Sequence, residues 1–267
     1  MTILTPARTD AVESLMREVA RDVVMPRFRN LAADEIREKA ADDLVTIADQ
    51  ESEARLAEGL TAILPNADVV GEEACAADPS VQDRIGTGAV WIIDPIDGTG
   101  NFAAGRAPFG IMVALAVDGD VQAGWMFDPL AGRMCHARLN EGAFIDGQRV
   151  TARGSGADIP LAGISVLFMD PDHRRRTIDA ASGKLAMVDI PRCAAEQYPR
   201  VVLGQNDMAL FERTLPWDHA PGVLFLNEAG GVALRADGTP YRVTDRRTGL
   251  LAAASPALWE QGARILF

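Results

Sequence analysis

Two aspartates lie three residues apart in the segment WIIDPIDGT, which covers residues 91–99. An apolar run ends in Asp94, Pro95 interrupts the simple continuation of a strand, and Asp97 follows. Two carboxylates held this close repel each other unless a cation lies between them. Oxygen ligands suit Mg²⁺ or Mn²⁺ better than zinc, and the carbonyl of Ile96 adds another oxygen. The segment therefore indicates a divalent metal site, with an ordinary Asx turn as the alternative.

The residues after Asp97 are suited to binding an anion. Gly98 and Gly100 flank Thr99, and glycine allows the backbone to turn sharply. The backbone amides of these three residues can face a phosphate, as amides do at the start of a helix.

Three other acids stand at the ends of expected elements. Glu72 follows a short apolar strand, Asp49 stands near the start of a helix, and Asp218 opens another helix. Each has a structural alternative, since Asp49 and Asp218 can be helix N-caps and Thr46 can form a capping pair with Asp49. The recurrence of acids at element ends favours a shared site.

The first half of the chain must supply most of these positions. Hydrophobic spacing predicts a helix over 12–24, ended or kinked by Pro26, and a second helix over 49–64. Alternating and apolar runs predict strands, with tight turns at 118–120 and 146–147. These strands cover 68–71, 90–93, 111–117, 121–127, 133–137 and 143–150.

The second half mixes strands and helices. We expect helices over 170–182 and 218–229 and a C-terminal helix from Ser255. The expected strands cover 164–168, 200–203, 232–234 and 250–253. The sequence thus predicts a layered fold of the α+β or α/β class. We expect an N-terminal α+β half (1–152) that carries most metal ligands and a C-terminal α/β half (153–267) that carries Asp218 and the substrate-side segment.

The overall composition narrows the class of partner. The 267 residues include 26 Lys and Arg and 38 Asp and Glu, a formal net charge of −12. This balance argues against nucleic acids and anionic membranes as partners. The hydrophobic fraction of 48% argues against disorder, and no apolar run is long enough for a transmembrane helix. An N-terminus without a signal-peptide pattern and three widely spaced cysteines predict a cytoplasmic location.

The motifs together resemble those of the inositol monophosphatase family, which belongs to the superfamily of Mg²⁺-dependent, lithium-sensitive phosphatases. Their order and spacing match over nearly the whole chain. The resemblance implies an αβαβα sandwich, usually dimeric, that hydrolyses a small-molecule phosphate monoester. The matching segments are DLVT at 43–46 with Asp49, GEE at 71–73, the 91–99 segment with Asn101 and Phe102, WD at 217–218, and EAGG at 228–231.

The resemblance also implies roles for individual residues. Two to three Mg²⁺ ions are implied, with Mn²⁺ as an alternative. The residues of the first metal site are Glu72, Asp94 and the Ile96 carbonyl, and those of the second are Asp94, Asp97 and Asp218. Asp49 stands near a third metal, and Thr99, with Glu72 or Asp49, orients the attacking water. Metal ions can activate water and neutralise phosphate without a covalent enzyme intermediate.

The substrate side departs from the pattern of inositol-specific relatives. Arg192 and Cys193 precede Ala194 where those relatives carry Gly and Thr or Ser. The position seven residues before Asp218 is Phe211 rather than glutamate, with Glu212 beside it. The expected substrate-binding residues are Asp97, Gly98, Thr99, Gly100, Arg192, Cys193, Ala194 and Asp218.

Because of these departures, the sequence does not identify the leaving group of the phosphate ester. Inositol-phosphate-like and histidinol-phosphate-like esters come first, and a 3′(2′),5′-bisphosphate nucleotidase or a fructose-1,6-bisphosphatase is the alternative. The sequence contains no GxxxxGK[ST] or GxSxG motif, which argues against a P-loop enzyme and a serine hydrolase. A role as a protein partner in a transcription complex is the hypothesis of another class.

Overall fold

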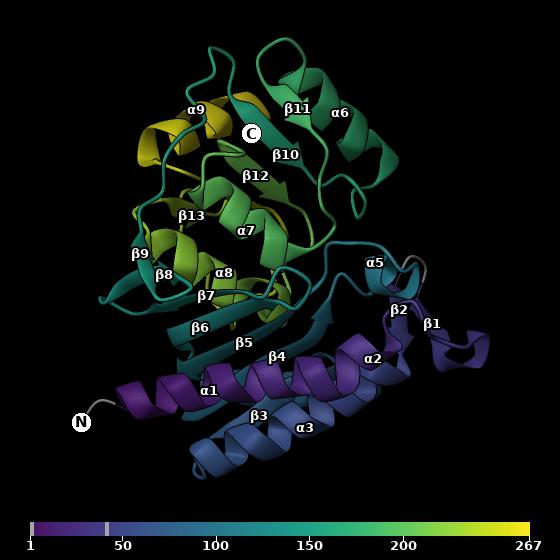
Figure 1. The fold of residues 1–267 in the computed structure, drawn as a ribbon. Helices are drawn as coiled ribbons and strands as arrows, with labels where there is room; N and C mark the ends of the chain where they lie inside the picture. The colour runs from purple at the N-terminus through teal and green to yellow at the C-terminus, as the bar shows by residue number, and fades with distance from the viewer. Residues whose placement is uncertain (1–2, 41–42) are drawn as a thin grey trace.

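Five layers stack in the computed structural model, which describes residues 3–40 and 43–267 (Figure 1). Helices cover one face of a seven-stranded sheet, two helices separate this sheet from a five-stranded sheet, and two more helices cover the far face. Three clusters of buried side chains fill the spaces between the layers. This arrangement confirms the predicted αβαβα sandwich.

The first layer consists of α1 (Pro6–Val19) and α3 (Ile47–Ile63), which pack on each other and on the large sheet. Helical backbone continues beyond α1 through a π-helical turn (Ala20–Val24) and α2 (Met25–Arg27). Pro26 therefore does not end the run. Pro26 has no amide hydrogen to donate, and it directly follows a π-helical turn in which Met25 N donates a hydrogen bond to the carbonyl of Ala20. Such a turn changes the direction of a helix without ending it.

The large sheet has the strand order β3-β4-β5-β6-β7-β8-β9. Only the β3–β4 pair is parallel, and the other neighbours are antiparallel. Because β3 and β4 run in the same direction, their carboxyl ends meet at one edge of the sheet. The strands are β3 (Asp68–Gly71), β4 (Ala89–Asp97), β5 (Gly110–Val117), β6 (Asp120–Asp128), β7 (Arg133–Arg138), β8 (Gly142–Ile145) and β9 (Gln148–Val150).

The middle layer consists of α7 (Ala194–Val202) and α8 (Pro216–Glu228). Apolar side chains surround α8 on all sides because it packs against both sheets, and its buried residues run almost continuously from Pro216 to Leu226. Among the described residues, no helix has both the length and the apolar character needed to cross a bilayer.

The small sheet has the strand order β11-β10-β12-β14-β13, and α6 (Pro171–Ala181) and α9 (Pro256–Leu266) form the outer layer. Strands β10 and β12 are parallel neighbours, so the segments that follow them lie side by side. The strands are β10 (Leu161–Ile164), β11 (Ala186–Val188), β12 (Met208–Phe211), β13 (Val232–Leu234) and β14 (Leu250–Ala253). A β1–β2 hairpin (Ile36–Ala40, Asp43–Thr46) and the short helices α4 (Glu72–Ala77) and α5 (Thr99–Ala103) complete the edge near the carboxylates.

Two predicted strands are wrong. Residues 200–202 end α7 and Leu203 is its C-cap, because Val201 and Val202 continue the buried stripe of Ala194 and Tyr198 at helical spacing. The strand predicted over 164–168 ends at Ile164, and the following residues form a loop. Strand β10 pairs with β11 on one side and with β12 on the other, and the sequence analysis assigned neither partner.

Candidate active site

The end of β4 places the central acids. Asp94 pairs with Met112 and Asp97 pairs with Gly110, so three steps on β4 oppose two on β5. Pro95 has no amide to donate, which explains why the ladder is irregular between the two aspartates. Both side chains are almost fully buried, with exposed fractions of 2% for Asp94 and 9% for Asp97.

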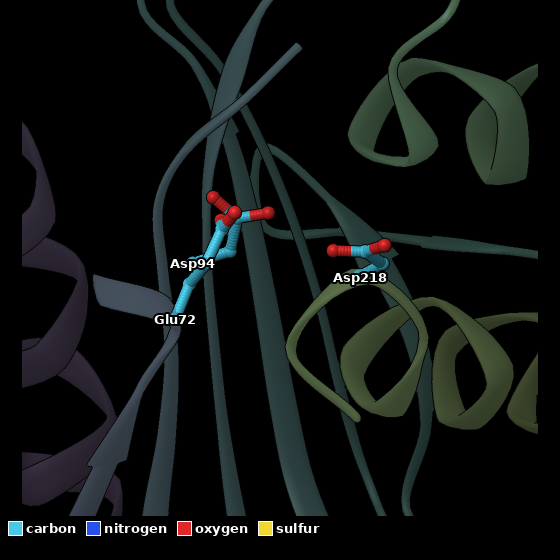
Figure 2. A group of neighbouring side chains, drawn as sticks. All are labelled: Glu72, Asp94 and Asp218. Carbon is cyan, nitrogen blue, oxygen red and sulfur yellow. The ribbon is translucent and has the colours of Figure 1, made fainter. Parts of the chain in front are cut away.

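Three carboxylates from distant parts of the chain meet beside this strand end (Figure 2). Glu72 begins α4 directly after β3, Asp94 lies on the neighbouring strand, and Asp218 lies in the first turn of α8. One oxygen of each lies within 4.8 Å of the others. Burial and the negative charges of Glu72, Asp97 and Asp218 raise the pKa of Asp94 well above its usual range.

Asp97 lines the same cavity, but its carboxylate also faces α7. Its Oδ2 accepts a hydrogen bond from the amide of Ala195 at 2.6 Å. Gly110 makes this approach possible, since a Cβ there would lie 2.8 Å from the Ala195 Cβ. Burial raises the pKa of Asp97 to about 6, although hydrogen bonds from Ala195 and Cys193 oppose the rise.

Asp49 is the third residue of α3 and closes a capping box with Thr46. Its Oδ2 accepts hydrogen bonds from the Thr46 amide at 2.8 Å and the Thr46 hydroxyl at 2.6 Å. The predicted Thr46–Asp49 capping pair is thus confirmed, whereas Asp49 and Asp218 are not N-caps. Burial raises the pKa of Asp49 to about 7 despite these bonds.

Thr99 connects Asp49 to the strand end. Its hydroxyl lies 3.2 Å from Asp49 Oδ1 and 2.9 Å from the carbonyl oxygen of Ile96. With a single proton, the hydroxyl can donate to only one of them at a time. Thr99 begins α5 after Gly98, whose φ of 84° lies in the left-handed region that favours glycine.

A lysine that the sequence analysis missed contacts the acids from the other side. Lys39 Nζ, on β1, lies 2.8 Å from an oxygen of Glu72 and 2.8 Å from one of Glu73. Burial opposes its charged form, but the two glutamates outweigh burial and raise the pKa of Lys39. No motif marks this lysine in the sequence, because its position depends on the unassigned β1–β2 hairpin.

The carboxylates open into a cavity of about 170 Å³ that residues of both sheets line. Gly98, Thr99 and Gly100 line it near the acids, and the predicted residues Arg192, Cys193 and Ala194 line another wall. Arg192 is exposed and has a φ of 54°, whereas Cys193 is buried. Further lining residues come from the loops after β10 and β12, including Ser165, Leu167, Phe168, Glu212 and Arg213.

Phe211 and Glu212 both line the cavity, with different surroundings. The Phe211 ring stacks on Tyr198 at 5.3 Å and meets His219 edge-on at 4.7 Å. The side chain of Glu212 is 14% exposed, and its Oε2 lies 3.8 Å from Nδ1 of His173. An acidic residue at position 212 therefore lines the cavity although residue 211 is aromatic.

His219 supports this wall rather than taking part in the acid cluster. Its Nδ1 lies 2.8 Å from the Tyr198 hydroxyl, and its Nε2 lies 3.0 Å from the carbonyl oxygen of Arg213. A carbonyl only accepts, so Nε2 carries the proton and Nδ1 accepts from Tyr198. Burial lowers the pKa of His219 to about 3, so the ring is neutral at physiological pH.

Two other functional candidates escaped the sequence analysis. Glu53 stands four residues after Asp49, on the same helix face, and this spacing could have indicated it. Gln197 lines the cavity from the first turns of α7 and is 3% exposed, and none of the described residues forms a hydrogen bond with its side-chain amide. Nothing in the sequence distinguishes Gln197 from the other residues of its helix.

The clustered donors fit a hard divalent cation. All three are carboxylates, the Ile96 carbonyl and Asp97 lie beside them on β4, and the described residues include no histidine or cysteine in the cluster. Carboxylates and carbonyls are the ligands that Mg²⁺ prefers. A bound cation would also compensate the like charges that raise the pKa of Asp94.

Comparison with known proteins places this geometry in a family. The model of the inositol monophosphatase family matches residues 7–266. The inositol-1-monophosphatase of Caulobacter vibrioides is 30% identical over 246 residues, which cover 90% of this chain and 92% of that protein. The histidinol-phosphatase of Chlorobaculum parvum is 31% identical over 72% of this chain and 73% of its own length. The structure of inositol monophosphatase II from Staphylococcus aureus superimposes with a TM-score of 0.82 at 25% identity, covering 98% of this chain and 94% of that one. The chain belongs to the inositol monophosphatase family, whose members are phosphoric monoester hydrolases.

Proposed function

We propose that this protein is a Mg²⁺-dependent phosphatase that hydrolyses a small-molecule phosphate monoester. The observation that carries the proposal is the meeting of Glu72, Asp94 and Asp218 at the cavity, with donor oxygens within 4.8 Å of one another. The family is metal-dependent, typically with Mg²⁺. The acids of this cluster would repel a phosphate ester unless cations compensated them.

The predicted ligand sets remain the most economical assignment. Glu72, Asp94 and the Ile96 carbonyl would hold one Mg²⁺, and Asp94, Asp97 and Asp218 a second. Asp49 would stand beside a third, and Mn²⁺ would serve as a substitute. When bound, these ions would supply water activation and charge neutralisation at the phosphate.

Thr99 would position the attacking water. Its hydroxyl lies within reach of both Asp49 and the Ile96 carbonyl. If the proton points to Asp49, the lone pairs of the Thr99 oxygen can accept a hydrogen bond from the water. Asp49 would thus orient the hydroxyl, and the turn at Gly98 would hold it at the cavity wall.

Replacing Thr99 with Val is expected to lower kcat by about 100-fold, because the group that orients the water is lost. The variant should keep its Mg²⁺ affinity and its thermal midpoint, since the two side chains have similar shapes. Thr99→Ser, which retains the hydroxyl, is the matched control and should keep most of the activity. Steady-state phosphate release measures both. A Val variant with the kcat of the wild type would contradict the role of the hydroxyl.

The substrate wall favours a leaving group that carries hydroxyl groups. Glu212 lines the cavity, and a carboxylate accepts hydrogen bonds from polyol hydroxyls. The Phe211 and Phe168 rings supply apolar surface near it. A negatively charged Glu212 disfavours a second phosphate, so bisphosphates fit this wall less well.

The same carboxylate supports a second candidate substrate. The amino group of histidinol phosphate is cationic, and Glu212 could pair with it. One relative is a histidinol-phosphatase, which agrees with this alternative. Arg192 lines the cavity and would bind an anionic group, should the substrate carry one.

A panel of four esters tests the proposal. We expect inositol 1-phosphate or histidinol phosphate to exceed adenosine 3′,5′-bisphosphate and fructose 1,6-bisphosphate by about 10-fold in kcat/KM, because Glu212 repels the second phosphate. Glu212→Gln should reduce this preference. Preference for a bisphosphate would refute the selectivity, and no phosphate release from any ester with Mg²⁺ would refute the phosphatase proposal.

Other predictions extend beyond the site. A homodimer, a cytoplasmic location and a division of labour between residues 1–152 and 153–267 stay predictions. A role in a transcription complex also stays a prediction, and it can coexist with catalysis. The chain retains every carboxylate of the predicted metal sites, so such a role would not replace the enzymatic one.

A further inference from the structure

Glu53 connects helix α3 to the start of helix α4. Its side chain is buried, with an exposed fraction of 8% for the residue. Oε2 accepts a hydrogen bond from the amide of Glu73 at 2.7 Å, and Oε1 accepts one from the amide of Ala74 at 2.8 Å. Both amides belong to the first turn of α4, the helix that begins with Glu72.

Gly71 provides the space that this carboxylate occupies. Its φ of −109° and ψ of 160° are extended values that any residue adopts, so the backbone does not require glycine. A Cβ at this position would instead overlap the carboxyl group of Glu53. The junction between β3 and α4 is therefore shaped around Glu53.

We propose that Glu53 is a positioning residue that sets the direction of the Glu72 carboxylate by fixing the first turn of α4. The two oxygens of one rigid carboxylate hold two consecutive amides, and this fixes how the chain leaves β3. Glu72 follows Gly71 directly, so its side-chain direction depends on this turn. The inference rests on the proposed metal site, because a fixed Glu72 matters only where its oxygen acts as a ligand.

The competing explanation is a through-space effect of the Glu53 charge on a nearby cation. Two variants keep the charge and remove the geometry. Glu53→Asp is one methylene shorter and cannot reach both amides, and Gly71→Ala places a methyl group where the carboxylate lies. Glu53→Gln keeps the length but removes the charge, and it turns an NH₂ donor toward one of the two backbone amides.

Calorimetric titration of the purified protein with Mg²⁺ alone tests the proposal without substrate. We expect Glu53→Gln, Glu53→Asp and Gly71→Ala each to weaken Mg²⁺ binding by about 10-fold or more. In activity assays, the Mg²⁺ concentration that gives the half-maximal rate should rise by a similar factor, while kcat at saturating Mg²⁺ should change much less. Hydrogen exchange at the amides of Glu73 and Ala74 should accelerate in each variant, a readout that needs no metal.

Glu228 provides a matched control. Its two oxygens accept hydrogen bonds from the amides of Asn140 and Gly142, both at 2.8 Å, at the end of α8 away from Asp218. Glu228→Gln should cost stability but leave Mg²⁺ affinity unchanged. Stability is monitored by thermal unfolding, and a variant that fails to fold is replaced by the next of the three.

Three outcomes separate the hypotheses. Wild-type Mg²⁺ affinity in folded Glu53→Gln would overturn the inference even in an active phosphatase. Weakened binding in Glu53→Gln alone would assign the effect to charge and also overturn it. A wild-type protein that hydrolyses no ester, yet binds Mg²⁺ in a way that depends on Glu53, would refute the proposed function and leave this inference standing.

Discussion

Replacing Asp94 with Asn is expected to abolish phosphatase activity and, at the same time, to stabilise the metal-free protein. Asp94 stands in both proposed ligand sets, so kcat/KM should fall by at least about 10³-fold. Without metal, however, its charge is buried beside those of Glu72, Asp97 and Asp218. Asparagine has a similar shape and removes that charge, and its side-chain oxygen can still accept the 3.1 Å hydrogen bond from Ile96 N.

The gain in stability should be about 1 kcal/mol or more at neutral pH, because the folded state no longer has to bury or protonate a carboxylate among other acids. For a chain of this size, 1 kcal/mol corresponds to about 2–4 °C in the thermal midpoint. Unfolding followed by circular dichroism in chelator measures the gain. Added Mg²⁺ should raise the midpoint of the wild type but not that of the variant.

Asp207 is the control for the same substitution at another buried carboxylate. It is 3% exposed and accepts hydrogen bonds from Leu161 N at 2.8 Å, Ser155 N at 2.7 Å and Ser155 Oγ at 2.5 Å. Asparagine there loses acceptors that the backbone requires, so Asp207→Asn should destabilise the protein. A destabilised Asp94→Asn variant, or one with undiminished turnover, would contradict the assignment of Asp94 as a bridging ligand.

Local patterns in the sequence predicted the parts of the site that depend on neighbouring residues. The Thr46–Asp49 capping box follows from two residues three apart, and the turn at Gly98 from a glycine after the strand. The five-layered fold followed from the family resemblance. The capping box and the turn are short motifs whose geometry depends only on neighbouring residues.

The parts that the sequence did not predict depend on long-range packing. Asp97 bonds Ala195, 98 residues later, because Gly110 admits α7 at that point. Lys39 reaches Glu72 only through a hairpin with no clear strand pattern. Residues 200–203 have the composition of a strand but form the last turn and the C-cap of α7, where both sheets bury the two valines. None of these contacts has a local signature.

The stability of the metal-free protein is expected to decrease as pH rises, and bound Mg²⁺ is expected to reverse this trend. The raised pKa values of Asp49, to about 7, and Asp97, to about 6, mean that the folded protein holds protons that the unfolded chain has already released above pH 4. The free energy of unfolding therefore decreases with pH between about 4 and 7, since the native state binds more protons. Bound Mg²⁺ takes the place of those protons and prefers the deprotonated carboxylates.

The difference between the thermal midpoints in Mg²⁺ and in chelator should thus widen from pH 5 to pH 8. At 100 times its dissociation constant, one ion adds about 2.7 kcal/mol, which corresponds to about 5–10 °C here. Chelation should abolish phosphate release in the same samples, and Mg²⁺ should restore it. Asp94→Asn keeps every other titrating group, so subtracting its profile isolates the contribution that depends on Asp94. A gap that stays constant with pH, or turnover that persists in chelator, would show that the buried acids do not act as metal ligands. The acids that are expected to destabilise the metal-free fold are thus the same residues that we propose as metal ligands.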